Sequence, residues 1–161
     1  MNQVKTLVIK KEKIFALSQF IVLIGIATTA PLLHSQPITG SIVNATLFIA
    51  VVLLGVRSAI LIGLIPSLIA LSTGLLPTVL APMIPFIITG NAVLILVFSY
   101  LRNKNYWLAM ISASLLKFLL LFSFSRGISS VIALMMSWPQ LLTALSGGLI
   151  AYLFLKAVKK F

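Results

Sequence analysis

The sequence predicts an all-α protein, a bundle of six transmembrane helices, and three observations lead to this fold class. Of the 161 residues, 61% are hydrophobic and only 8% are charged, whereas soluble domains are about half apolar with about a quarter of their residues charged. The apolar residues form long blocks, as membrane spans require. The 12 basic residues, against one acidic residue, form short clusters between these blocks. Such clusters orient a membrane protein and contact anionic lipid headgroups, so we expect a lipid bilayer and no nucleic acid as the partner.

The apolar blocks divide into six predicted spans within a single membrane domain, residues 1–161. The first block is about twenty residues long, which exceeds the core of a signal peptide, and Pro31 follows its small-residue site; a retained first helix is therefore expected. The second and third are short for a bilayer of about 30 Å and form a tight hairpin around 55–58. The predicted spans are 14–33, 42–56, 59–72, 83–101, 106–124 and 138–156.

Prolines and glycines mark the irregular parts of the predicted bundle. Pro66 lies within the third span and should kink it, because proline removes one backbone hydrogen bond. The connection 72–82 contains glycine and proline and predicts a loop. Residues 128–137 predict a short interfacial helix, and Pro139 suits the first turn of the last span.

The basic residues predict the orientation of the bundle. With six spans and the N-terminus inside, ten of the 12 basic residues fall on the inner side, whereas Arg126 lies on the outer side and Lys117 lies within a span. The positive-inside rule therefore predicts a multi-pass protein of the plasma membrane with both termini in the cytoplasm.

Lys117 is the residue that most needs an explanation. It lies eleven residues after Tyr106, or about 16 Å along a helix, and it shares a helix face with Ala109 and Ala113. Since a lysine facing lipid costs at least about 2.5–3.5 kcal/mol, we expect it to face the bundle interior. The only acidic residue, Glu12, belongs to the inner end, so the expected partners are backbone carbonyls, hydroxyls, water or a bound anion. Two interpretations stay open: a cation that faces a ligand, or a structural lysine that snorkels outward or is capped by carbonyls.

Four further polar residues are candidates for a binding site. Asn44 and His34 belong to the outer end of the first two spans, and Asn91 lies about a third of the way into the fourth. An amide at that depth either bridges helices or binds a ligand. Arg126 at the outer mouth either attracts anions or is simply solvated. His34 has no recognisable metal-ligand spacing to the methionines, so neither a metal nor another cofactor is expected.

Several catalytic signatures are absent from the sequence, which has no phosphate-binding GxxxxGK[ST] loop, no HExxH, no GxSxG and no pair of carboxylates. We therefore expect neither ATP hydrolysis nor any other enzyme activity. The small-residue pairs Ala144/Gly148 and Gly147/Ala151 mark the last span as a close-packing surface. Packing within the bundle is the preferred interpretation, and a partner subunit is the alternative.

Nearly the whole chain resembles the substrate-binding S component of an energy-coupling-factor (ECF) transporter. The resemblance is carried by six short helices, the proline-rich connection, PFIITGNAVLILVF (85–98) and WPQLLTALSGGLIAYLFLK (138–156). It implies a subunit that captures a vitamin or other micronutrient from outside and is served by a membrane coupling (T) subunit and two cytoplasmic ATPases. It also implies gating loops at 34–41, 72–82 and 125–130. The residues expected around one outer cavity are His34, Asn44, Asn91, Lys117 and Arg126.

The resemblance is incomplete on the first helix. Many S components carry an AxxxA pattern there for docking to the coupling subunit, whereas this chain has Gly25 and Thr29 at that spacing and Ala27/Ala30 at i, i+3. Gly25 and Thr29 are the expected docking residues. The leading hypothesis is an importer subunit that captures a small nutrient, anionic in the preferred interpretation. The alternatives are a channel or facilitator for an ion or small solute, and a membrane subunit that anchors or assembles a complex.

Overall fold

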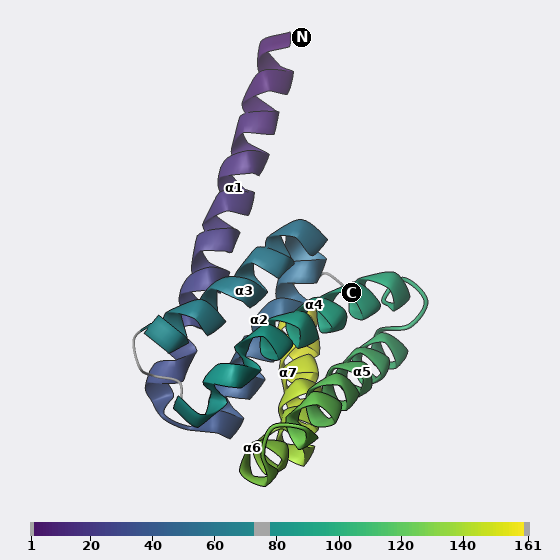
Figure 1. Ribbon diagram of the computed structural model, residues 1–161. Coiled ribbons are helices and arrows are strands. Elements are labelled where there is room, and N and C mark those ends of the chain that lie inside the picture. Colours follow the sequence, from purple (N-terminus) through teal and green to yellow (C-terminus); the bar gives the residue numbers. More distant parts are fainter. Residues whose placement is uncertain (1, 73–77, 160–161) are drawn as a thin grey trace.

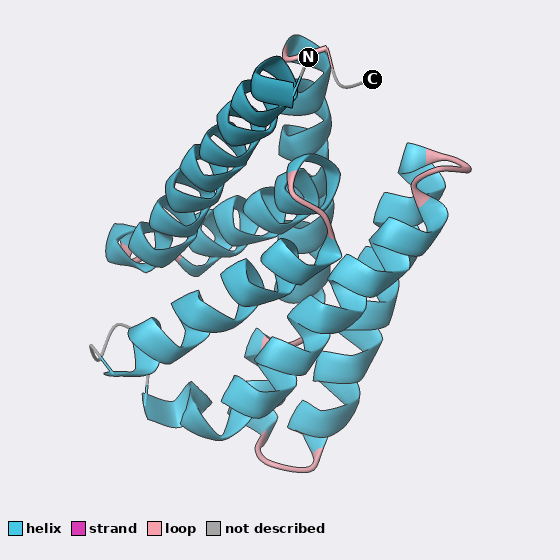
Figure 2. Ribbon diagram, turned by 90° about the horizontal axis from the view of Figure 1, so that it is seen from above, coloured by secondary structure: helices cyan, strands magenta, loops and turns pink. Residues whose placement is uncertain are grey.

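The computed structural model describes residues 2–72 and 78–159, and the regular structure of these residues is entirely helical, as predicted (Figures 1 and 2). Six long α-helices are joined by short connections, and two 3₁₀ helices and one short α-helix, α6, lie within those connections. In chain order the elements are α1 (Asn2–Thr29), η1 (Ala30–Leu33), α2 (Gln36–Leu53), α3 (Val56–Ser72), η2 (Thr78–Met83), α4 (Ile84–Leu101), α5 (Tyr106–Arg126), α6 (Ser130–Met135) and α7 (Trp138–Ala157).

Among the described residues, five segments are long and apolar enough to cross a membrane: Lys11–Leu33, Gln36–Leu53, Leu80–Leu101, Tyr106–Arg126 and Ser130–Ala157. These segments indicate a multi-pass membrane protein. The remaining long helix, α3, contains a shorter apolar stretch, Val56–Ile69. The 17 residues of α3 extend over about 25 Å, so α3 is the segment on which the predicted count of six spans depends.

The long helices run up and down between two ends of the bundle, which carry different features. The basic end holds the turns at Gly55 and at 102–105 together with the C-terminus of α7. The cavity end holds η1, η2 and α6, and the short helix predicted within 128–137 is present there as α6. The N-terminal part of α1 extends beyond the other helices (Figure 1).

The second span begins earlier than predicted, at Gln36 rather than 42, so most of the expected loop 34–41 is helical. Pro37 occupies the first turn of α2, where its fixed φ angle favours a helix start. Hydroxyl groups that resemble loop residues in the sequence bond to backbone carbonyls: Thr39 Oγ1 donates to Ala30 O (2.9 Å) and Ser41 Oγ to Pro37 O (2.8 Å). The predicted loop 72–82 is likewise partly helical, because residues 78–83 form η2; residues 73–77 lie outside the described part.

Close contact between α2 and α7 determines the position of the first half of α2. A methyl group added at Gly147 would lie 2.7 Å from Asn44 Cβ and 2.8 Å from both the Ala45 nitrogen and the Ser41 oxygen. The two backbones therefore touch at this glycine. Gly148 lies equally close to α5, and there the contact is with the side chain of Met110. Both small-residue pairs of the last span are buried, at Ala144, Gly147, Gly148 and Ala151, which confirms that they serve packing within the bundle.

An aromatic cluster fills the half of the bundle next to the basic end. Phe98 is fully buried, with ring centroids 4.7 Å from Phe48 and 5.3 Å from Tyr106. The Tyr106 hydroxyl donates to Gly148 O at 2.6 Å and ties α5 to α7. At the end of α2, Arg102 Nη1 donates to Val51 O (3.1 Å). This half of the bundle is therefore densely packed.

Candidate ligand-binding site

A cavity of about 340 Å³ lies in the half of the bundle away from the aromatic cluster, next to η1, η2 and α6. Its walls come from η1 and the first half of α2, from α3 around Pro66, from η2 and α4, and from α5, α6 and α7. The volume is at the lower end of the range of about 300–1,000 Å³ that is usual for small-molecule sites. Four of the five predicted site residues line it: His34, Asn44, Asn91 and Lys117.

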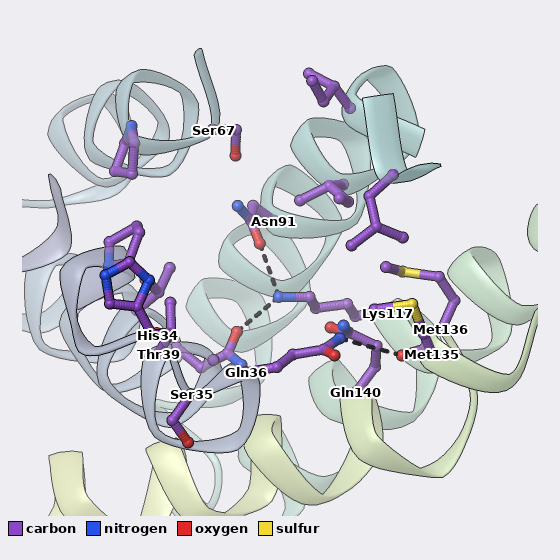
Figure 3. Close-up of a pocket in the computed structure, with 18 residues that line it drawn as sticks. His34, Ser35, Gln36, Thr39, Ser67, Asn91, Lys117, Met135, Met136 and Gln140 are labelled. Carbon is purple, nitrogen blue, oxygen red and sulfur yellow. Dashed lines mark hydrogen bonds between the residues drawn. The ribbon is translucent and has the colours of Figure 1, made fainter. Parts of the chain in front are cut away.

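Lys117 reaches this cavity from the middle of α5 and is only 4% exposed. Its Nζ donates to Asn44 Oδ1 at 2.6 Å and to Asn91 Oδ1 at 2.7 Å (Figure 3). Ala109 and Ala113, on the same face of α5, are fully buried. The prediction that this face points into the bundle is confirmed, and a lysine that snorkels outward is excluded by its burial.

The partners of Lys117 differ from those expected from the sequence. Carbonyls, hydroxyls, water and a bound anion were expected, but two asparagine amides accept from the ammonium group. Asn44 lies 73 residues from Lys117 in sequence and Asn91 lies 26 residues from it. The resemblance placed Asn44, Asn91 and Lys117 around one cavity, but residue spacing along one chain gives no indication that α2, α4 and α5 converge at this depth, so the direct bonds among the three were not predicted.

Asn91 also connects the site to α3. Its Nδ2 donates to Gly63 O at 3.0 Å, so the amide joins α3, α4 and α5, as the bridging interpretation predicts. Pro66 lies inside α3 and has no N–H for the carbonyl one turn earlier. Neighbouring side chains commonly satisfy backbone groups next to a proline in a membrane helix. The carbonyl that Pro66 leaves without an N–H donor is that of Ile62, and Asn91 bonds to the carbonyl next to it, Gly63 O.

Asn44 is 1% exposed and sits where α2 touches Gly147 of α7. Its oxygen must face Lys117, because an ammonium group only donates hydrogen bonds. Its NH₂ group, on the same carbon as that oxygen, makes no bond to the ammonium, and no acceptor takes it among the residues that the structure describes. An unused amide donor is consequently left beside the lysine.

His34 and Arg126, the two other predicted site residues, differ in position. His34 lines the cavity at the end of η1 in a left-handed conformation (φ 50°). Arg126 is exposed and does not line the cavity; its guanidinium lies 5.2 Å from the centroid of the Phe122 ring. It is nine residues after Lys117, and at 100° per residue these two side chains leave opposite faces of α5. The prediction that Arg126 lies around the cavity is therefore wrong.

Uncharged polar residues that were not proposed as site residues also line the cavity. Gln36 begins α2, and its Nε2 donates to Met135 O at 3.5 Å, a long and therefore weak bond. The set also includes Ser35 and Thr39 at the start of α2, Gln140 in the first turn of α7 and Ser67 next to Pro66. Each of these polar residues lies within a turn of a helix start or a proline, and this position is the sequence signal that could have identified them.

The cavity offers no evident metal site. The described residues contain no group of three or more His, Cys, Asp or Glu side chains that could hold an ion. Met135 and Met136 line the cavity, but they lie across it from His34 (Figure 3). The chemistry available is a single ammonium group, amides, hydroxyls and an apolar wall.

The predicted docking residues on α1 lie on its outward face. Thr29 is exposed, and nothing lies within 4 Å of a methyl group placed at Gly25. Ala27 and Ala30, the alternative pair, are buried against the bundle. Of the two pairs, only Gly25 and Thr29 present a surface to another helix.

No family model, curated protein or solved structure matches the chain.

Proposed function

We propose that this chain is the substrate-binding subunit of an importer of the energy-coupling-factor type, and that it captures a small anionic nutrient such as a vitamin. The observation that carries this proposal is the Lys117 ammonium group, buried at the base of a cavity and held only by uncharged amides. A buried cation without a protein carboxylate attracts an anion. The chain's one acidic residue, Glu12, is exposed on α1 and does not line the cavity.

The dense half of the bundle favours a binding subunit over a channel. A channel needs a continuous path, whereas the fully buried rings of Phe48 and Phe98 occupy the interior next to the basic end. The cavity is therefore closed toward the basic end, as a binding pocket is. Release to the other side then requires movement of the whole subunit, which depends on an energy source elsewhere.

The partners in this proposal supply that energy. The chain lacks an ATP-binding loop, so two cytoplasmic ATPases act through a membrane coupling subunit. The exposed face of α1 at Gly25 and Thr29 is the docking surface for that coupling subunit, because a missing side chain allows another helix to approach closely.

The proposal also includes six spans, an outward-facing cavity and two cytoplasmic termini in the plasma membrane. In the part of the chain that the structure describes, nine of the 11 basic residues belong to the end opposite the cavity. Under the positive-inside rule that end faces the cytoplasm, so the cavity opens to the outside.

Purification from the native host in mild detergent tests the proposed function. A tagged chain should bring with it one membrane coupling protein and two ATPases, and native mass spectrometry should detect a retained small molecule. Lys117→Met should lose that molecule, whereas Lys104→Met, which removes an exposed charge at the basic end, should retain it. Recovery of the chain alone would favour a channel or facilitator, and recovery of an enzyme would favour an anchoring subunit; either result contradicts the proposal.

A further inference from the structure

The two amides that hold Lys117 are not equivalent, and their difference indicates how a ligand binds. Asn91 uses its oxygen for the ammonium and its NH₂ group for Gly63 O. Asn44 uses its oxygen in the same way, but its NH₂ group has no acceptor among the described residues. Asn91 therefore holds the bundle together, whereas Asn44 still has hydrogen-bonding capacity to offer to a molecule in the cavity.

Lys117 offers a second donor beside that amide. An ammonium group carries three N–H bonds, and within the described part of the chain two oxygens accept from it. The third N–H and the Asn44 NH₂ group belong to directly bonded partners, so they lie close together. A carboxylate has two acceptor oxygens and fits two neighbouring donors, one of them charged.

The charge of the lining limits the ligand to a single negative charge. Lys117 is the only basic or acidic side chain, histidine aside, among the lining residues that the structure describes. A second negative charge would find no further cation with which to pair among these residues, so its removal from water would not be compensated. Phosphate esters and dicarboxylates are therefore poor ligands.

The polar residues of the lining lie at two depths along α2. Gln36 begins α2 and precedes Asn44 by eight residues, a rise of about 12 Å. Gln36, which is exposed, and Gln140 carry uncharged amides, and apolar side chains such as Ile87 and Met136 also line the cavity. A ligand that fills this space has an apolar middle and an uncharged polar group far from its anion.

We infer that the substrate is a small, elongated monocarboxylate with an apolar middle and an uncharged hydrogen-bonding group at the far end. Its carboxylate binds Lys117 Nζ and Asn44 Nδ2. This inference rests on the proposed role of the chain as a substrate-binding subunit and adds to it the ligand class and Asn44 as the specificity residue.

Calorimetric titration of the full chain in detergent with four probes of similar length tests the ligand class. The probes are 6-acetamidohexanoate, its primary amide 6-acetamidohexanamide, octanedioate and hexyl phosphate. The first should bind at least about tenfold more tightly than each of the others, a difference of about 1.4 kcal/mol. Tighter binding of octanedioate or hexyl phosphate overturns the monocarboxylate class and leaves the binding role intact. If none of the four probes binds, the inference is wrong. The proposed function is then still tested by whether the coupling protein and the ATPases are recovered with the tagged chain.

Asn44→Asp tests the assigned contact without removing the lysine. The new carboxylate occupies the position of the amide, pairs with Lys117 and repels an anionic ligand. The variant should fold with an unchanged or higher melting temperature and bind 6-acetamidohexanoate at least about tenfold more weakly. Asn103→Asp, at an exposed position of the basic end, is the matched control and should bind normally. A folded Asn44→Asp protein with unchanged affinity would show that the carboxylate binds elsewhere.

Discussion

Lys117 is solvated by amide dipoles instead of being neutralised by a carboxylate, and this difference determines what the residue can do. A carboxylate partner would cancel the charge within the protein and leave little attraction for an anion. The oxygens of Asn44 and Asn91 stabilise the ammonium group by hydrogen bonds of 2.6 and 2.7 Å and leave its net charge in place. The residue thus stays buried and keeps its charge available to an anionic ligand, as the proposed function requires.

The dependence of Lys117 on Asn91 can be measured as a stability difference. Asn91→Leu removes one acceptor from the buried ammonium and the donor to Gly63 O, and hydrogen bonds to charged groups contribute about 1.5–3 kcal/mol. We expect the free energy of unfolding, measured by SDS titration, to fall by about that amount. Asn103→Leu, at an exposed turn position, should change it by less than about 0.5 kcal/mol.

A double-mutant cycle separates the ammonium contact from the α3 contact. In the Lys117→Met background no charge requires an acceptor, so Asn91→Leu should cost less than it does in the natural chain. The remaining cost reports the bond to Gly63 O. If the two substitutions are simply additive, Asn91 does not stabilise the lysine, and the amide site described here is incorrect.

At the scale of elements, the contact between α2 and α7 positions Asn44. Gly147→Ala places a methyl group 2.7 Å from Asn44 Cβ and 2.8 Å from backbone atoms of α2, and overpacking of this kind costs about 1–3 kcal/mol. The variant should unfold more easily in SDS titration and should also bind 6-acetamidohexanoate more weakly, since α2 must shift.

Gly25→Ala is the matched control for that change. Nothing lies within 4 Å of the added methyl group, and alanine is the better helix former by up to about 1 kcal/mol. Its stability should be unchanged or higher. Equal stability of the two alanine variants would mean that α2 and α7 do not touch at Gly147.

The same open face of α1 permits a test of subunit docking. Gly25→Leu fills the space that the coupling subunit would occupy, while the isolated chain should fold and bind ligand as before because nothing in the bundle contacts that position. Recovery of the coupling protein and ATPases in the tagged purification should fall by at least about tenfold, or about 1.4 kcal/mol. Gly127→Leu, an equal enlargement in an open turn, should leave recovery unchanged; undiminished recovery with Gly25→Leu places docking on another surface.

Local periodicity predicted the elements well but did not predict how they meet. The spacing of Ala109, Ala113 and Lys117 is a property of one helix, and it placed the lysine in the bundle correctly. The contact of that lysine with Asn44 and Asn91 depends on helix crossings that no spacing records. Arg126 was assigned to the cavity because the resemblance implied a gating loop at 125–130, whereas its helical phase directs it away.

The start of α2 was misplaced for a different physical reason. Polar residues between 36 and 41 resemble a loop in an apolar sequence, but hydroxyls such as those of Thr39 and Ser41 bond to nearby carbonyls and are compatible with a membrane helix. Gln36 lines the cavity and is also exposed. Because the polar residues that line the cavity resemble loop residues, the sequence did not indicate that α2 begins at Gln36.

At the scale of the whole molecule, the proposal requires the cavity end to face the outside of the cell. The chain contains no cysteine, so single cysteines report the topology directly. Ser130→Cys at the cavity end and Asn103→Cys at the basic end replace exposed residues. A membrane-impermeant maleimide should label Ser130→Cys in intact cells and Asn103→Cys only after permeabilisation, because the clustered basic residues retain their end in the cytoplasm. The natural chain should remain unlabelled. The opposite labelling pattern would mean that the cavity opens to the cytoplasm. A buried cation there could not capture a nutrient from outside, so the proposed uptake function would be wrong.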